Sequence, residues 1–342
     1  MPPTLKDVAE AAGVSIPAVS KVLHGRGTNV RVSEAKASAI REAAERLKYY
    51  PNALARTLRT GRSHTVGLLF ENFGEISAGP LYYVHLLDGV AQELFSHHYR
   101  LTILPEIEND DLLSTLGDGQ LEGVIWCKMP KANETLDLIG RCPIPLVALN
   151  APPPDKATNT VFVACDNEAG ARLVVRHLAE LGHQRILFVM EHREERTPDA
   201  IARREGFLKA SRECGLASDE RDIVHWSRDA HELKIWAQRP DRHTAIFAWN
   251  ERVGAEILLR AAECGLRVPR DLSVVGFDST RFCETTTPRL TAARQPISQM
   301  ARRATRLLLE MIEGQAPENF VVQFPCTLDV RDSTACPPDP KG

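Results

Sequence analysis

The first sixty residues contain three short runs in which apolar side chains recur at the spacing of a helix. The first run follows Thr4, which can cap a helix with Asp7 as its capping-box partner, and it ends at Gly13. The second begins after Ser15. The third begins after Ser33 and supplies the apolar face that two short helices need. The pattern predicts three small helices, the first two crossing steeply around the glycine turn.

From residue 64 onward, short apolar runs alternate with amphipathic stretches, which is typical of a parallel α/β fold. We expect helices after Asp166, from Thr197-Pro198, and from Asn250 to Gly265. The alternation recurs in two blocks and so predicts two similar subdomains that face a cleft. The expected strands are 66–70, 101–104, 123–127, 145–149, 185–190, 244–249 and 272–277.

Charge is distributed unevenly between these two parts. Residues 1–63 hold 11 Lys and Arg against 5 Asp and Glu, whereas the remainder holds 31 basic and 40 acidic residues. A basic head on an acidic body is typical of a nucleic-acid-binding module joined to a part that does not bind nucleic acid. An ordinary solvated surface would give the same counts, so the motifs must discriminate.

Several other classes of protein lack support in the sequence. No apolar run reaches the roughly 18 residues of a membrane span, and residues 1–7 lack the apolar region of a signal peptide, so we expect a cytoplasmic protein. The eight cysteines form no C-x-x-C pair and are expected to be reduced packing residues. Dinucleotide-binding, P-loop and nucleophile-elbow motifs are missing from the sequence, so no catalytic residue, metal or cofactor is expected. Two alternative functions remain for the α/β part of the chain. One is an enzyme on the same scaffold, and the other is a transport-type sugar receptor, although such a receptor would need export.

Residues 4–60 resemble the DNA-binding head of the lactose/galactose-repressor (LacI/GalR) family, and the likeness continues to about residue 331. The resemblance implies a small all-α helix-turn-helix head followed by an α/β periplasmic-binding-protein-like effector domain of two subdomains. The motifs in the head are Thr4-Leu5-Lys6-Asp7-Val8-Ala9, Gly13-Val14-Ser15, Val19-Ser20-Lys21-Val22-Leu23-His24-Gly25 and Tyr50-Pro51-Asn52-Ala53-Leu54-Ala55-Arg56-Thr57-Leu58.

The pattern and the resemblance together divide the chain into four segments. They are a helix-turn-helix head over 1–50, a hinge helix and linker over 51–63, a ligand-sensing domain over 64–331 and a flexible tail over 332–342. Within the sensing domain, the N-subdomain is expected to take about 64–163 and 292–322, and the C-subdomain about 164–291 and 323–331.

By the resemblance, the second helix lies in the major groove, where Ile16, Pro17 and Lys21 occupy base-reading positions. Asn52 would cap a hinge helix in the minor groove, and Leu58 would insert there as an apolar wedge. The alternative for the head is a three-helix bundle with no DNA role. The full set of expected DNA-binding residues is Thr4, Ser15, Ile16, Pro17, Ser20, Lys21, His24, Arg26, Arg31, Ser33, Asn52, Ala55 and Leu58.

Ligands of open α/β sheets bind beyond the carboxyl ends of the strands, where this sequence places aromatic and hydrogen-bonding residues. Such groups suit a polyhydroxylated ligand such as a sugar, although nucleosides need similar ones. For any one residue the alternative is a loop cap or turn former. The resemblance adds Arg203, in an Arg-x-x-Gly-Phe segment, and Trp226, and it places Asn150 where many members have an Asp. The expected effector-binding residues are Phe73, Trp126, Asn150, Arg203, Trp226, Asn250 and Asp278.

These observations predict a ligand-responsive, sequence-specific transcriptional regulator, most simply a repressor. We expect it to bind an inverted-repeat DNA operator and a carbohydrate effector. A homodimer is expected because the proline-rich tail has no heptads for a coiled coil. The hinge over 52–60 is too short to be helical alone, so it would order when two hinges pack together on DNA. A ligand that rotates one subdomain would change their spacing, as an inducer or as a co-repressor.

Overall fold

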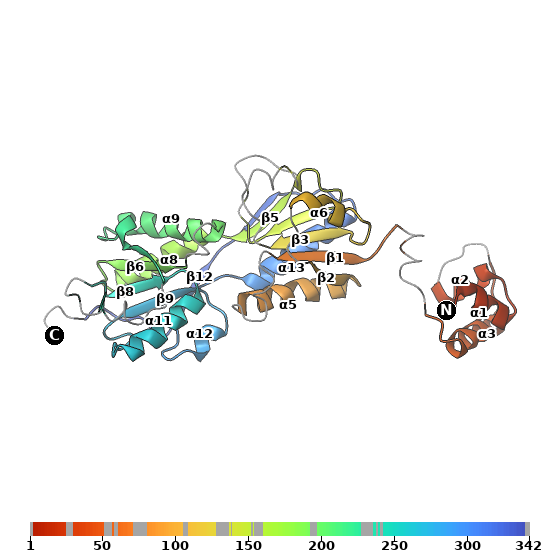
Figure 1. Cartoon of the computed structure of the whole chain (residues 1–342), viewed down its shortest axis with the longest axis horizontal. Coiled ribbons are helices and arrows are strands. Elements are labelled where there is room, and N and C mark those ends of the chain that lie inside the picture. The colour runs from red at the N-terminus through yellow and green to blue at the C-terminus, as the bar shows by residue number, and fades with distance from the viewer. Residues whose placement is uncertain are drawn as a thin grey trace. The chain divides into compact units, whose positions relative to one another are not determined.

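The computed structural model divides into two compact units, Met1–Ser63 and His64–Gly342, which Figure 1 shows as ribbons. The structure describes residues 3–24, 30–50, 57, 61–70, 81–104, 109–127, 137, 139–151, 153, 160–191, 197–226, 235–236, 239 and 242–338.

The first unit contains the three expected helices, α1 (Leu5–Ala12), α2 (Ile16–His24) and α3 (Glu34–Arg46). The Thr4 side chain caps α1 in a complete capping box with Asp7, and Gly13 ends the helix with a φ of 61°. Val8, Val19 and Ile40, one from each helix, are fully buried against one another. The prediction of a small helical head is confirmed.

The second unit contains two six-stranded sheets, and all but one of its strand pairs are parallel. The exception is the antiparallel pair β10–β12. The first sheet has the order β11 (Val321–Phe324), β5 (Val161–Cys165), β4 (Leu146–Leu149), β3 (Gly123–Cys127), β1 (Thr65–Phe70), β2 (Arg100–Leu104). The second has the order β12 (Thr327–Asp329), β10 (Thr291–Arg294), β9 (Ser273–Asp278), β8 (Ala245–Ala248), β6 (Ile186–Met190), β7 (Ile223–His225).

Helices cover both sheets (Figure 1). On the first sheet, α5 (Leu81–Ser96) and α13 (Ile297–Ile312) pack together on one face, and α6 (Asn109–Leu116) packs over a separate hydrophobic cluster. On the second, α8 (Asn167–Glu180) and α9 (Pro198–Glu213) lie on one side and α11 (Glu251–Glu263) on the other. Two short elements, the 3-10 turn η3 (Glu220–Asp222) and α12 (Phe282–Thr285), complete this unit. Over the part of the chain described, no helix is long and apolar enough to cross a membrane.

All seven expected strands are present as β1, β2, β3, β4, β6, β8 and β9, and the three expected helices as α8, α9 and α11. Asp166 and Asn250 cap α8 and α11 through their side chains, as expected. The strands β5, β7, β10, β11 and β12 were not expected.

The chain passes between the sheets three times, after β5, after β10 and after β11. The expected subdomain boundaries at 163, 291 and 322 fall within these three strands. Each passage therefore lies two or three residues later than expected, because the last residues of each strand still pair with their own sheet.

Residues 332–338 do not form the flexible tail that was expected. Ser333 is fully buried; its Oγ donates to the Val274 carbonyl at 2.5 Å and accepts from the Thr291 N–H at 2.8 Å. Two residues on, Ala335 exchanges hydrogen bonds with Ser273 Oγ. The segment is held because it satisfies polar groups of β9 and β10 that would otherwise be buried without partners.

Candidate effector site and DNA-binding head

Arg203 is the centre of a buried polar cluster in the second unit. It lies on α9, and it is 1% exposed. Its Nε donates to Asn167 Oδ1 at 2.9 Å, Nη1 to the Trp249 carbonyl at 2.6 Å and Nη2 to Asp278 Oδ1 at 3.3 Å. Asp199, one turn earlier on the same helix, lies 3.8 Å from Nη2. The arginine thus joins the beginnings of α8 and α9 to the carboxyl ends of β8 and β9.

The guanidinium is charged and enclosed by aromatic rings. Burial alone would lower the pKa of Arg203, but the carboxylates of Asp278 and Asp199 outweigh it and raise that pKa. The guanidinium carbon lies 3.8 Å from the ring centroid of Phe277 and 5.4 Å from that of Trp249. A cation held in this way orients its neighbouring carboxylate rigidly.

Asp278 is also held from the passage between the sheets. Gln295, which follows β10, donates from Nε2 to Asp278 Oδ1 at 2.6 Å, and Cys165, which ends β5, donates from Sγ to Gln295 Oε1 at 3.0 Å. A change in how the two sheets face each other would therefore act directly on the residues around Asp278.

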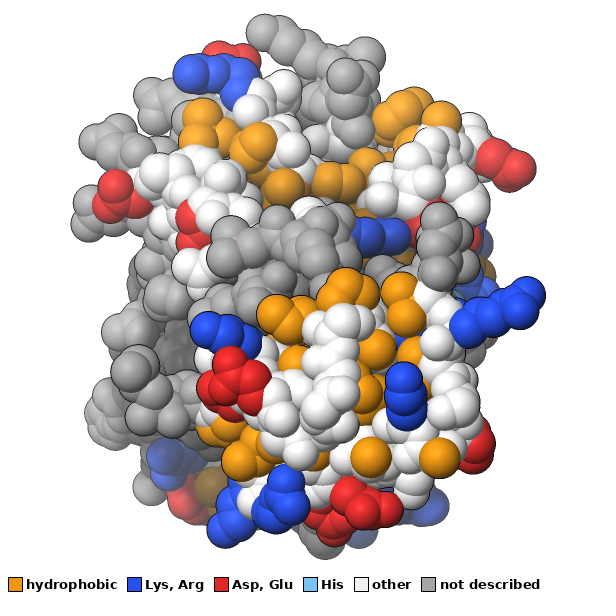
Figure 2. Space-filling view, turned by 90° about the vertical axis from the view of Figure 1, so that its right-hand side faces the viewer, with side chains coloured by type: hydrophobic (Ala, Val, Ile, Leu, Met, Phe, Trp, Pro, Cys, Tyr) orange, Lys and Arg blue, Asp and Glu red, His pale blue; other side chains and the backbone are white. Residues whose placement is uncertain are grey.

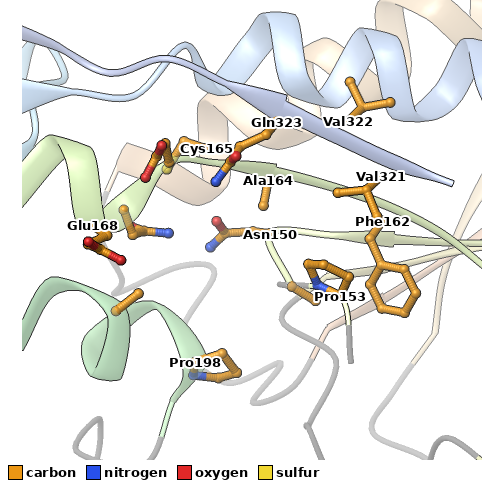
Figure 3. Close-up of a pocket in the computed structure, with 14 residues that line it drawn as sticks. Asn150, Pro153, Phe162, Ala164, Cys165, Glu168, Pro198, Val321, Val322 and Gln323 are labelled. Atoms are coloured by element: carbon orange, nitrogen blue, oxygen red, sulfur yellow. The ribbon is translucent and has the colours of Figure 1, made fainter. Parts of the chain in front are cut away.

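A pocket of about 220 Å³ adjoins this cluster. Cys165 and Asn167 line the pocket, and they also bond to Gln295 and Arg203 of the cluster. Asn150, which follows β4, is 3% exposed and has a φ of 55°. Figure 3 shows its amide within the pocket, between Pro198 and Gln323. Neither its Oδ1 nor its Nδ2 has a hydrogen-bond partner among the described residues. Because a buried amide without partners is costly, this one is available to a ligand.

The seven expected effector residues fall into three groups. Arg203 and Asp278 contact each other, Asn250 begins the helix beside them and Asn150 lines the adjoining pocket. Of the other two that are described, Trp126 lies away from the cluster, whereas Trp226 lies just beyond the carboxyl end of β7, at the same edge of the second sheet as Asn250 and Asp278. Trp126 packs in the hydrophobic cluster beneath α6, and Trp226 follows the edge strand β7, where its buried Nε1 lacks a hydrogen-bond partner. Phe73 lies outside the described residues.

Three further residues belong to the cluster and were not expected from the sequence, namely Asn167, Asp199 and Gln295, and the unexpected Tyr82 lies near enough for the charge of Asp199 to act on it. Tyr82 lies on α5, under the first sheet, and its buried hydroxyl has no hydrogen-bond partner among the residues described. Burial, and next the nearby charges that include Asp199 of α9, raise the pKa of Tyr82 well above its usual value. Only Asp199 had a sequence signal, since it stands four residues before Arg203 on one helix.

In the first unit, the beginning of α2 presents its side chains to solvent. Ser15, Ile16 and Pro17 are exposed, while the next two residues, Ala18 and Val19, are buried in the core. Lys21 lies one turn further on, and its Nζ donates to the Val30 carbonyl at 2.5 Å. The helix therefore brings the expected base-reading positions together on one side.

The remaining expected DNA contacts are only partly described. Thr4, Arg31 and Ser33 are exposed, and Ser20 is half-buried on α2. The side chain of His24, and Arg26, Asn52, Ala55 and Leu58, lie outside the described residues. No group of three or more His, Cys, Asp or Glu within the described ranges could hold a metal ion.

Comparison with known proteins defines the class. Residues 4–52 match the bacterial regulatory proteins of the lacI family, and residues 175–334 match a periplasmic binding protein-like domain. The transcriptional regulator GalS of Salmonella typhimurium is 32% identical over 342 residues, which cover 97% of this chain and 96% of that protein. The matched class is a regulator with a helix-turn-helix head, and not an enzyme.

Two solved structures extend the comparison. The complex of the regulator CelR with cellobiose is 26% identical, has a TM-score of 0.69 and covers 97% of this chain and 99% of its own. The lac repressor dimer bound to its operator and the anti-inducer ONPF is 22% identical, with a TM-score of 0.83 over 98% and 100% of the two chains, and it shares the fold. The chain belongs to the lacI family of bacterial regulatory proteins.

Proposed function

We propose that this protein is a transcriptional repressor whose affinity for operator DNA changes when a small carbohydrate binds between its two sheets. The observation that carries the proposal is the buried cluster of Arg203 and Asp278 beside a pocket in which the amide of Asn150 has no partner. Neither a packing core nor a solvated surface requires such an arrangement.

The donors and acceptors of this site suit hydroxyl groups. Asp278 Oδ1 accepts from Arg203 and Gln295, and its second oxygen is the acceptor that we assign to a ligand hydroxyl. The Asn150 amide offers both a donor and an acceptor. The aromatic rings of Phe277 and Trp249 stiffen the arginine behind them. The cellobiose complex of CelR supports a sugar as the ligand class.

For the head, we propose that Ile16, Pro17 and Lys21 contact base edges in the major groove, while Arg31 and the exposed serines contact phosphates. On the face that Figure 2 shows, Lys and Arg side chains are distributed among apolar and acidic ones. We propose a cytoplasmic location, because the proposed operator is part of bacterial DNA.

We further propose a homodimer, the assembly named for the lac repressor bound to its operator. Exposed apolar side chains on one face of α5 support this: Leu81 (37%) and Val84 (42%) near its beginning and Phe95 (60%) near its end, with the exposed Asp88 between them. A single exposed apolar residue needs no explanation, but an aligned set is typical of an interface.

The test of this function combines ligand and DNA measurements. Neutral sugars and nucleosides are screened by thermal shift against the wild type and Asp278→Asn, because a ligand that binds the folded state raises its melting temperature. We expect a sugar to stabilise the wild type and not the variant, and to change operator binding of the wild type alone. Equal stabilisation of both proteins by every sugar that binds would contradict the site assignment, and stabilisation by nucleosides alone would contradict the ligand class.

A further inference from the structure

Asp278 lies in a backbone turn that non-glycine residues adopt only when neighbouring groups stabilise it. Its φ is 84°, and that of the next residue, Ser279, is 48°. Two successive non-glycine residues in the left-handed region store strain, and such a turn persists only when its surroundings hold it. The residues that hold this turn therefore fix the direction of the Asp278 carboxylate.

Glu251 holds the turn from α11. Its Oε2 accepts from the Thr280 N–H at 2.7 Å and from Cys283 Sγ at 3.2 Å, and its Oε1 accepts from Thr280 Oγ1 at 2.6 Å. Glu251 is 1% exposed and Thr280 is 5% exposed, so water cannot replace these bonds. One carboxylate thus satisfies three donors of the segment that follows β9.

The opposite side of the turn is held separately. Ser279 Oγ donates to Asp329 Oδ2 at 2.5 Å and accepts from Arg331 Nη2 at 3.0 Å. These two residues stand on and after β12, whereas Glu251 stands directly after Asn250 at the beginning of α11. Glu251 is therefore the group that ties the turn to Asn250, another of the expected effector residues.

We propose that Glu251 is a positioning residue of the effector site: by binding the backbone and side chain of Thr280, it fixes the strained turn that aims Asp278 at the ligand and keeps Asn250 in register with it. The ligand part of this inference rests on the proposed function. The positioning of the turn by Glu251 does not, because it follows from the contacts alone.

The cost of placing a carboxylate here argues against a role in packing. Burial, and next the charge of Asp278, raise the pKa of Glu251 to about 7. The thiol of Cys283 donates to the same carboxylate, and the charge of Arg331 also acts on that thiol. Apolar residues of the same size generally pack more favourably than a buried charge. The helix also approaches β9 closely, since a Cβ on Gly276 would lie 3.2 Å from the Glu251 Cα.

Hydrogen–deuterium exchange of the ligand-free, full-length chain tests the positioning directly. We compare the wild type, Glu251→Gln and the control Glu263→Gln, which removes an exposed carboxylate paired with Arg260 on the same helix. In Glu251→Gln the amide nitrogen cannot accept from Thr280, so exchange in residues 278–283 should rise about tenfold or more, with β6 and β8 unchanged. The control should match the wild type. Unchanged exchange in 278–283, or a rise of equal size throughout the second unit, overturns the proposal.

Binding measurements separate positioning from simple stabilisation. Calorimetry uses D-glucose, D-galactose, D-ribose and cellobiose as probes. For any sugar that binds the wild type, we expect Glu251→Gln and Thr280→Val to weaken it about tenfold or more, with ligand-free operator affinity unchanged. Thr280→Ser keeps both donors, the backbone N–H and the side-chain hydroxyl, and should bind the sugar as the wild type does. Equal sugar affinity in Glu251→Gln overturns the inference. If none of the four sugars binds the wild type, the carbohydrate assignment fails and the exchange experiment alone decides the role of Glu251.

Discussion

Arg203 shows how tightly one residue can be bound to its surroundings. The guanidinium has almost no contact with water, and its charge is balanced by Asp278 and Asp199. A buried charge is tolerated when it is paired and hydrogen-bonded, whereas removal of one partner leaves the others uncompensated. The free energy of folding and the geometry of the effector site therefore depend on the same three side chains.

We predict that Arg203→Ala lowers the free energy of unfolding by about 3–5 kcal/mol, because it leaves two buried carboxylates without a cation. Asp278→Asn should cost less, since it removes the charge but keeps an acceptor for Gln295. Urea unfolding at pH 7.5 measures both. Arg204→Ala is the control, because the neighbouring Arg204 is 41% exposed in a long surface pair with Glu220. A loss for Arg203→Ala no larger than that control would show that the pair is not coupled to folding.

Glu251 gives a prediction about pH. Its pKa is about 7 in the folded protein and 4.5 as an ordinary carboxyl. Between pH 4.5 and about pH 7, Glu251 keeps its proton in the folded state but has lost it in the unfolded state. The free energy of unfolding therefore falls as the pH rises through this range, by at most about 1.4 kcal/mol per pH unit. Above pH 7 this dependence ends.

The measurement is urea unfolding from pH 4.5 to 8 for the wild type and Glu251→Gln. The difference between the two stability profiles isolates this carboxyl from the other titrating groups. We expect the wild type to lose stability relative to the variant as the pH rises to 7. Parallel profiles would show that Glu251 titrates normally.

Successive side chains of a strand point to opposite faces of the sheet, and this alternation limits which site residues can be predicted from the sequence. Asn250 and Asp278 could be located because they stand at or just beyond the ends of clear apolar strands, whereas Arg203, which lies within α9, was located through the family resemblance. Trp126 stands one residue before the end of β3, so its side chain points to the α6 face, opposite to those of its neighbours. Gln295 reaches the cluster from the segment after β10, and tertiary packing alone brings it there.

At the scale of elements, burial accounts for most of the strands that could be predicted, although β2 was predicted at a sheet edge with mostly exposed side chains and β5 was missed although it is buried. The central strands β3, β4, β6, β8 and β9 are almost wholly buried and appear as continuous apolar runs. The edge strands β7, β11 and β12 have only three or four residues with partly exposed side chains, so pairing with a neighbour defines them. β5 is a buried apolar run that satisfies the same rule as the central strands.

The C-terminal segment gives a prediction at this scale. A chain ending at Arg331 lacks Ser333, so the Thr291 N–H and the Val274 carbonyl lose their partners in the interior. Each unsatisfied group costs about 1–3 kcal/mol, and we expect a clear fall in the melting temperature by calorimetry. A chain ending at Pro338 is the control and should melt like the full chain. Equal melting of all three chains would mean that the segment contributes nothing.

Helix α2 gives the prediction on DNA readout. Lys21→Ala should cost about 1–3 kcal/mol of operator affinity and relax the choice of base at one position, where lysine favours guanine O6 and N7. Ile16 and Pro17 should select thymine methyl groups. Arg31→Ala should weaken all sequences alike and reduce the salt slope by about one. Selection from randomised DNA checks this, and a selected motif unchanged by Lys21→Ala, or altered by Arg31→Ala, contradicts the division.

At the scale of the whole molecule, the three passages of the chain between the sheets couple ligand binding to the relative orientation of the two sheets. Gln295 and Cys165 stand at two of these passages and bond to each other beside Asp278. A ligand that favours one arrangement of the sheets shifts the population toward it. In sequence, residues 51–63 connect this unit to the head, so the shift would be transmitted through them to the DNA-binding helices.

Assembly determines what that shift does on DNA, and here we predict a homodimer that binds an inverted repeat. Two heads related by a two-fold axis match two half-sites of opposite orientation. The C-terminal residues 332–338 pack on their own unit, so they do not supply a separate tetramerising helix. Light scattering at micromolar concentration should give twice the mass of the 37.9 kDa chain. Val84→Glu on α5 should shift the measured mass toward that of a single chain. DNA carrying an inverted repeat should bind with higher affinity than a direct repeat of the same half-sites. A stable tetramer, or equal affinity for the two arrangements, would exclude this assembly.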